Sequence, residues 1–203
     1  MTSSTLSRVR LGLWAAVIVA ALAATVAFFG GYVKPSSQVA DPNIGGGTYS
    51  LVDQRGNPVD QTMLVGQPSL MFFGFTHCPI VCPTTMVEMA GWFEELGAEA
   101  GPLNAYFVTV DPARDTPEML NDYVSWVSDR ITAVTGKPEE IDKIIKAWGV
   151  VAEKVDGEGG EYDVNHTASV FLINARGEFE GTISYGETQD MAVAKIRKLL
   201  QKA

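Results

Sequence analysis

An uninterrupted apolar stretch, Ser69–Phe75, constrains the fold most, because it has the length of a strand and no polar side to turn toward water. A strand that is apolar on both sides must be covered on both faces, as in a sheet with packed helices. The stretch runs into the segment THCPIVC, which contains both cysteines of the chain, Cys78 and Cys82. Thr84–Glu95 then shows apolar residues at helical spacing. The cysteines are therefore expected at a junction between a strand and a helix.

Similar patterns recur along the rest of the chain. Strands are predicted at 49–53, from 59 onward, and at 105–110, 131–135, 150–155, 169–174 and 178–185, and helices from 117 onward and at 138–148 and 188–201. The acidic, glycine-rich segment 156–165 is predicted to be a mobile loop that ends at His166. Alternating strands and helices predict an α/β fold, a three-layer sandwich of the thioredoxin-like type with an N-terminal hairpin.

An uncharged run, Leu11–Val33, precedes this domain and is long enough to cross a bilayer about 30 Å thick as a single transmembrane helix. A cleaved signal peptide is the alternative, but its apolar core would usually be shorter, so an uncleaved anchor is favoured. Arg8 and Arg10 keep the start of the chain in the cytoplasm by the positive-inside bias. The predicted order is a cytoplasmic tail at 1–10, an anchor at 11–33, a flexible tether at 34–47 and a domain at 48–203, which in a bacterium lies in the periplasm.

The charge of the exported part excludes one class of partner. From Pro35 onward the chain has twelve basic and twenty-four acidic residues, a formal charge of −12. A surface of that sign repels phosphate backbones, so nucleic acid is not expected as a partner.

The spacing of the cysteines narrows the chemistry of the site. Three residues separate Cys78 from Cys82, whereas thioredoxin-like oxidoreductases have two, and haem attachment requires a histidine directly after a CxxC pair. A structural zinc site usually needs four ligands, which two cysteines and two histidines supply only awkwardly because His77 adjoins Cys78. The pair is therefore either a redox couple or two thiolate ligands of a soft metal such as Cu(I).

A first helical turn or a proline-bounded loop would each bring the two sulfur atoms together. Cu(I) accepts two or three soft ligands, and an imidazole can complete the set. His166 is the candidate third ligand, since it enters a strand whose start is expected near the other strand ends. His77 is the weaker candidate, because its neighbour Cys78 leaves little freedom for both side chains to point at one ion.

Two carboxylates follow the strand predicted at 105–110. Asp111 and Asp115 could polarise the cysteine site or receive a partner. The simpler expectation is structural, with Asp115 or Thr116 capping the next helix and Asp111 stabilising the turn before Pro112.

Three segments together are similar to the signatures of the Sco/SenC family: GFTHCPIVCPT at 74–84, VDPARDTP at 110–117, and Asn165-His166 before an apolar strand. With the N-terminal anchor they cover nearly the whole chain. The resemblance implies a thioredoxin-like domain at a respiratory membrane that binds one copper, as Cu(I) or Cu(II), through Cys78, Cys82 and His166. It also implies a metallochaperone that assists assembly of the copper A centre in subunit II of cytochrome c oxidase, with a periplasmic copper donor and a thiol reductant as further partners.

The chain departs from the family pattern at two positions. Family members often have an acidic residue where this chain has Ile80, and often aspartate where it has Asn165. Losing these carboxylates changes the local charge and hence the thiol pKa or the preferred copper state, while the three ligands stay in place.

An enzymatic function is the rival prediction. A thiol–disulfide reductase that reduces the copper-ligand cysteines of the target would need Cys78 and Cys82 as its redox pair but not His166. A copper or redox sensor is a third possibility. No further catalytic residue is assigned.

Overall fold

The structure is a computed structural model that forms two compact units, residues 1–41 and 42–203. It describes residues 13–14, 17–19, 25, 44–157 and 161–202. The predicted tail lies outside the described residues, as do most of the predicted anchor and tether. No helix in the described part of the chain is long and apolar enough to cross a membrane.

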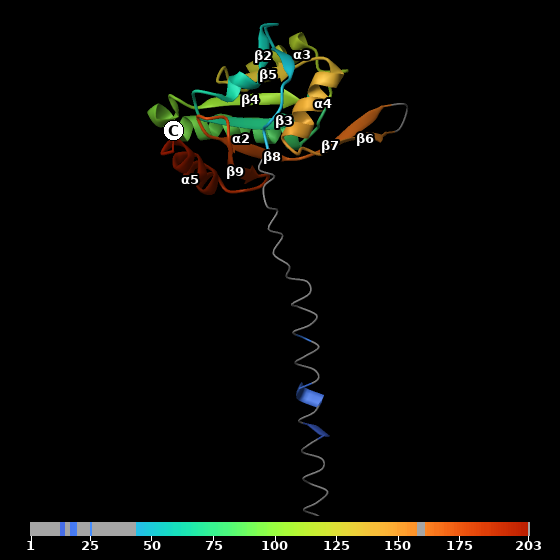
Figure 1. The fold of residues 1–203 in the computed structure, drawn as a ribbon, viewed down its shortest axis with the longest axis vertical. Coiled ribbons are helices and arrows are strands. Elements are labelled where there is room, and N and C mark those ends of the chain that lie inside the picture. Colours follow the sequence, from blue (N-terminus) through green and yellow to red (C-terminus); the bar gives the residue numbers. More distant parts are fainter. Residues whose placement is uncertain (1–12, 15–16, 20–24, 26–43, 158–160, 203) are drawn as a thin grey trace, which may run out of the picture. The chain divides into compact units, whose positions relative to one another are not determined.

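The second unit is a mixed α/β domain, shown in Figure 1. Its elements are β1 (Ser50–Asp53), β2 (Pro58–Asp60), η1 (Gln61–Leu64), β3 (Ser69–Gly74), α2 (Val81–Leu96), η2 (Gly97–Ala100), β4 (Asn104–Thr109), α3 (Pro117–Ser125), β5 (Ile131–Thr135), α4 (Pro138–Ala147), β6 (Ala152–Asp156), β7 (Tyr162–His166), β8 (Ser169–Ile173), β9 (Phe179–Ser184) and α5 (Gln189–Leu200). The predicted strands and helices are present, with ends shifted by a few residues.

The main sheet has seven strands in the order β2-β1-β5-β4-β3-β8-β9. β3 pairs in parallel with β4 and antiparallel with β8, and all six of its residues are buried, as the apolar sequence predicts. In the parallel register Gly74 lies opposite Thr109, so both strands end at the same edge of the sheet. The loops that follow them, one with the cysteines and one with Asp111 and Asp115, therefore leave the sheet side by side.

The helices contribute their apolar faces to one core. α2 contacts α5, and α5 also contacts β8 and β9, while α3 packs on β5 and α4 on β1. The buried side of α2 includes Cys82, Met86 and Met89, whose spacing follows the helical period. α2 begins at Val81, which places Cys82 in its first turn and Cys78 in the preceding loop.

The prediction of a mobile loop at 156–165 is wrong for the second half of that segment. Residues Tyr162–His166 form β7, which pairs antiparallel with β6 and places His166 opposite Ala152. A two-stranded ribbon can leave acidic side chains in water, so the polar composition did not prevent strand formation. The aromatic ring of Tyr162 instead packs beneath two cations, Lys154 and Arg114.

Of the two N-cap candidates for α3, Asp115 and Thr116, Thr116 takes this position. Thr116 has an extended backbone directly before Pro117, and its hydroxyl accepts a hydrogen bond from the Met119 amide. Asp115 lies one residue too early for this role, and its carboxylate is fully buried and bonded elsewhere.

Removing the cap should destabilise the domain. Thr116→Ala leaves the first amides of α3 without their acceptor and should lower the free energy of unfolding by about 1 kcal/mol. Urea denaturation of the variant and the wild type measures the difference. Equal midpoints would show that Thr116 does not cap the helix.

Candidate metal centre

Cys78 and Cys82 form the sulfur side of the site. Both are free thiols, Cys78 partly exposed and Cys82 fully buried. The Cys78 amide donates to the Phe75 carbonyl at 3.3 Å, and the Cys82 amide donates to Cys78 Sγ at 3.3 Å. Because this last bond comes from the first turn of α2, the partial positive charge of the helix end acts on Cys78 Sγ.

His166 supplies a nitrogen atom from the end of β7. Its Nε2 lies 3.3 Å from Cys82 Sγ, and its Nδ1 lies 3.1 Å from the Thr167 carbonyl oxygen. Since a carbonyl can only accept, Nδ1 carries the hydrogen and Nε2 presents its lone pair to the sulfur side. Burial lowers the pKa of His166, which favours this neutral form.

Two phenylalanine rings set the orientation of the His166 imidazole. The Phe75 ring stands nearly perpendicular to it, with the centroids 5.6 Å apart, and the Phe72 centroid lies at 6.1 Å. Both rings belong to β3 or the residue after it. The strand that leads into the cysteines therefore also forms the wall against which the histidine packs.

The donor atoms of Cys78, Cys82 and His166 all lie within 4.8 Å of one another. Two sulfur atoms and one imidazole nitrogen at that separation suit a single soft metal ion in a low-coordinate site. The structure thus brings together the three residues proposed as ligands from the sequence. His77 is exposed and lies outside the cluster, with its Nδ1 3.1 Å from Thr76 Oγ1.

Gly74 makes room for the buried sulfur. A Cβ atom at this position would lie 2.9 Å from Cys82 Sγ and 2.8 Å from the Phe107 ring, closer than packed atoms allow. Burial raises the pKa of the Cys82 thiol. The protonated thiol is therefore the stable form of the apo site, and a bound metal would have to displace that proton.

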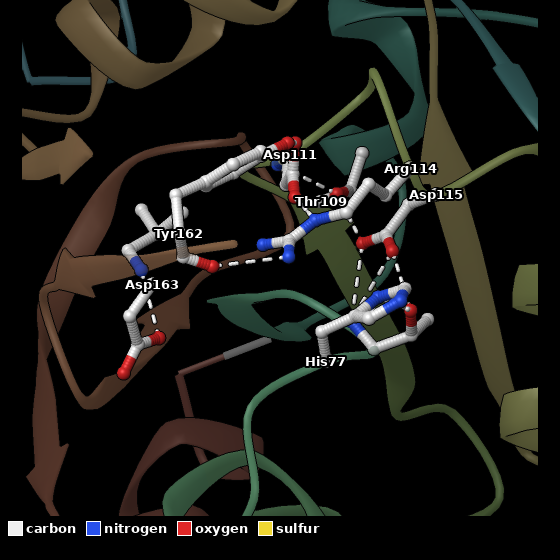
Figure 2. Close-up of polar contacts among 9 residues, drawn as sticks. His77, Thr109, Asp111, Arg114, Asp115, Tyr162 and Asp163 are labelled. Carbon is white, nitrogen blue, oxygen red and sulfur yellow. Dashed lines mark hydrogen bonds and ion pairs between the residues drawn. The ribbon is translucent and has the colours of Figure 1, made fainter. Parts of the chain in front are cut away.

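The buried carboxylate of Asp115 ties the cysteine loop to β4. It accepts hydrogen bonds from Thr76 Oγ1 and Thr109 Oγ1, each at 2.6 Å, and from the Thr76 amide at 3.2 Å (Figure 2). Burial raises its pKa. Thr76 and Thr109 were not predicted as site residues, because nothing in their local sequence signals a partner so far along the chain.

Asp111 makes a second buried connection, this one to β7. Tyr162 donates its hydroxyl to Asp111 Oδ1 at 2.7 Å, and Arg114 Nε donates to Asp111 Oδ2 (Figure 2). Asp111 begins a turn that contains Pro112, where the prediction placed a turn before that proline, and its carbonyl oxygen accepts from the amides of Arg114 and Asp115. Arg114 and Tyr162 were missed as well.

The close contact at Gly74 can be tested with a matched pair of glycines. Gly74→Ala places a methyl group against Cys82 Sγ and should lower the free energy of unfolding by about 1–3 kcal/mol. Gly91, inside α2, has open space around its Cα, so Gly91→Ala should raise the same quantity by up to about 1 kcal/mol. Chemical denaturation of both variants measures this, and a Gly74→Ala protein as stable as the wild type would contradict the described packing.

Comparison with known proteins identifies similar chains. A family model described as SCO1/SenC matches residues 37–201. A protein of Stutzerimonas stutzeri is 37% identical over 134 residues, which are 66% of this chain and 66% of the relative. The mitochondrial protein SCO1 homolog 1 of Arabidopsis thaliana is 31% identical over 147 residues, 72% of this chain and 43% of the relative. The chain thus spans less than two thirds of the length of these curated relatives.

A solved structure agrees with this relationship. Bradyrhizobium japonicum ScoI with copper bound superposes with a TM-score of 0.70 and 38% sequence identity, covering 76% of this chain and 98% of ScoI. The domain therefore has the thioredoxin-like fold of these proteins. Since the family model matches most of its length, the chain belongs to the SCO1/SenC family.

Proposed function

We propose that the chain is a copper metallochaperone that binds one copper ion through Cys78, Cys82 and His166. The observation that carries the proposal is the cluster itself, in which two thiols and the lone pair of a neutral imidazole lie within 4.8 Å. Family membership supports it, because a related protein, ScoI, has been solved with copper bound.

The unequal exposure of the ligands suits transfer rather than storage. Copper held by three ligands leaves room for a thiolate of the recipient, which can approach from the side of the partly exposed Cys78. As the new copper–sulfur bond forms, the bond to His166 breaks, and the two cysteines release the ion last. Cys82 is the ligand held most firmly, because it is buried against Gly74.

The recipient we propose is the copper A centre in subunit II of cytochrome c oxidase. The support is family membership, because BsSco, a solved structure of this family, is described as a cytochrome c oxidase assembly protein. The chain would work from the outer face of a bacterial inner membrane, anchored through residues 11–33. A periplasmic copper donor would load it, and a thiol reductant would keep Cys78 and Cys82 reduced, because an oxidising compartment favours their disulfide.

Thiol–disulfide reduction is the second candidate, favoured by the contrast between an accessible and a buried cysteine. Cys78 as thiolate would attack a target disulfide and form a mixed disulfide. Cys82, deprotonated, would then displace the target thiolate, leaving a Cys78–Cys82 disulfide and two reduced target sulfurs. This reaction needs two cysteines and no third metal ligand, whereas copper binding also uses the His166 nitrogen at 3.3 Å from Cys82 Sγ, which is why copper binding is the better account.

The two histidines of the chain provide a test with an internal control. His166→Ala removes one ligand and should weaken Cu(I) retention at least tenfold, roughly the lower end of what loss of a supporting metal-site residue costs. Competition with a coloured Cu(I) chelator under anaerobic conditions measures it. His77→Ala changes the exposed histidine and should leave retention as in the wild type.

The same variants separate the two functions. Disulfide exchange between Cys78–Cys82 and a small dithiol should proceed in His166→Ala as in the wild type. If His166→Ala retained copper as tightly as His77→Ala, His166 would not be a ligand and the metallochaperone proposal would lose its central observation.

A further inference from the structure

We infer that Asp111, Arg114 and Tyr162, hereafter the clamp, position His166 by fastening the β6–β7 ribbon to the body of the domain. The inference rests on the proposed function, because it concerns how the third copper ligand is held. The clamp residues do not touch the donor atoms, so they would act through His166 as positioning residues.

The ribbon needs such an attachment. β6 and β7 form a two-stranded sheet that is separate from the seven-stranded one, and it extends beyond the main sheet in Figure 1. Four of the five residues of β6 are exposed, and in β7 only Val164 is buried. An isolated two-stranded hairpin is marginally stable at best in water. The place of His166 therefore depends on the few contacts that β7 makes with the body.

Besides the His166–Cys82 contact at the metal centre, the clamp supplies polar contacts between β7 and the body. The Asp111 carboxylate is fully buried and holds the Tyr162 hydroxyl on one oxygen and Arg114 Nε on the other. Arg114 Nη1 donates to the Tyr162 carbonyl at 3.0 Å, and its guanidinium lies 3.7 Å from the centroid of the Tyr162 ring. Side chain and backbone of Tyr162 are thus both fixed to the loop that follows β4.

Fixing Tyr162 also restricts His166, because both residues lie on the same face of β7. Side chains alternate along a strand, so Tyr162, Val164 and His166 share the face of β7 that is turned toward the body. The guanidinium of Arg114 also lies 5.7 Å from the centroid of the Phe75 ring, and that ring contacts the His166 imidazole with the centroids 5.6 Å apart. Tyr162, Arg114, Phe75 and His166 form one continuous row of contacts.

A ligand held in place by such a row binds with less loss of conformational freedom than a ligand on a free ribbon. Loosening the clamp would leave the two cysteines untouched but would let His166 leave the metal more often. The clamp therefore sets how strongly copper is retained and how readily His166 gives way to an incoming ligand.

The test compares two tyrosine hydroxyls. Tyr162→Phe keeps the ring and removes the bond to Asp111. Tyr106→Phe removes a similar bond, to the Met63 carbonyl at 2.8 Å, from a strand that pairs with β3 and β5 and not with the ribbon. With the whole chain and Cu(I), Tyr162→Phe should weaken copper retention about tenfold, as loss of an outer-shell partner does, and Tyr106→Phe should not. In a His166→Ala background, Tyr162→Phe should have no further effect.

Hydrogen exchange of the apo protein provides a readout that needs no copper. Amides of β6 and β7 should exchange faster in Tyr162→Phe than in Tyr106→Phe, with the main sheet unchanged. Equal copper retention in the two variants, or an undiminished effect in the His166→Ala background, would overturn the inference. If the wild type retained no copper, the proposed function would fail, and unchanged exchange in the ribbon would then overturn the clamp by itself.

Discussion

The parallel pairing of β3 with β4 is the constraint on which the site depends. It ends both strands at one edge of the sheet, with Gly74 opposite Thr109, and so brings the cysteine loop beside the loop of Asp111 and Asp115. The buried Asp115 carboxylate then joins the two loops through Thr76 and Thr109. Without that register, neither the start of the cysteine loop nor the support of β7 would have a fixed place.

The chemistry of the site follows from the unequal burial of its two cysteines. Cys82 is fully buried beside Gly74 and has a raised thiol pKa, while Cys78 is partly exposed and its sulfur accepts an amide from the first turn of α2. Burying a thiolate costs free energy, so the apo site keeps the proton on Cys82. A bound soft cation offsets that cost and allows the thiolate to form. Ile80, 64% exposed, adds an apolar side chain between the two cysteines, where a carboxylate would have added negative charge.

Local sequence patterns predicted most of the fold, because apolar periodicity is a property of neighbouring residues, and the ligand types were evident from their chemistry. The remaining features depend on contacts between distant residues. Thr76 and Asp115 are 39 residues apart, and Arg114 and Tyr162 are 48 apart, so no short segment signals either pair. β7 was included in a predicted loop because the whole segment 156–165 is acidic and rich in glycine. The strand is held instead by its pairing with β6 and by the contacts of Tyr162.

The most direct test of the central claim is X-ray absorption of the whole chain loaded anaerobically with one equivalent of Cu(I). The account predicts one copper per chain, bound by two sulfur atoms and one imidazole nitrogen. A copper environment with sulfur alone would contradict the role of His166, and failure to retain copper at all would contradict the metallochaperone.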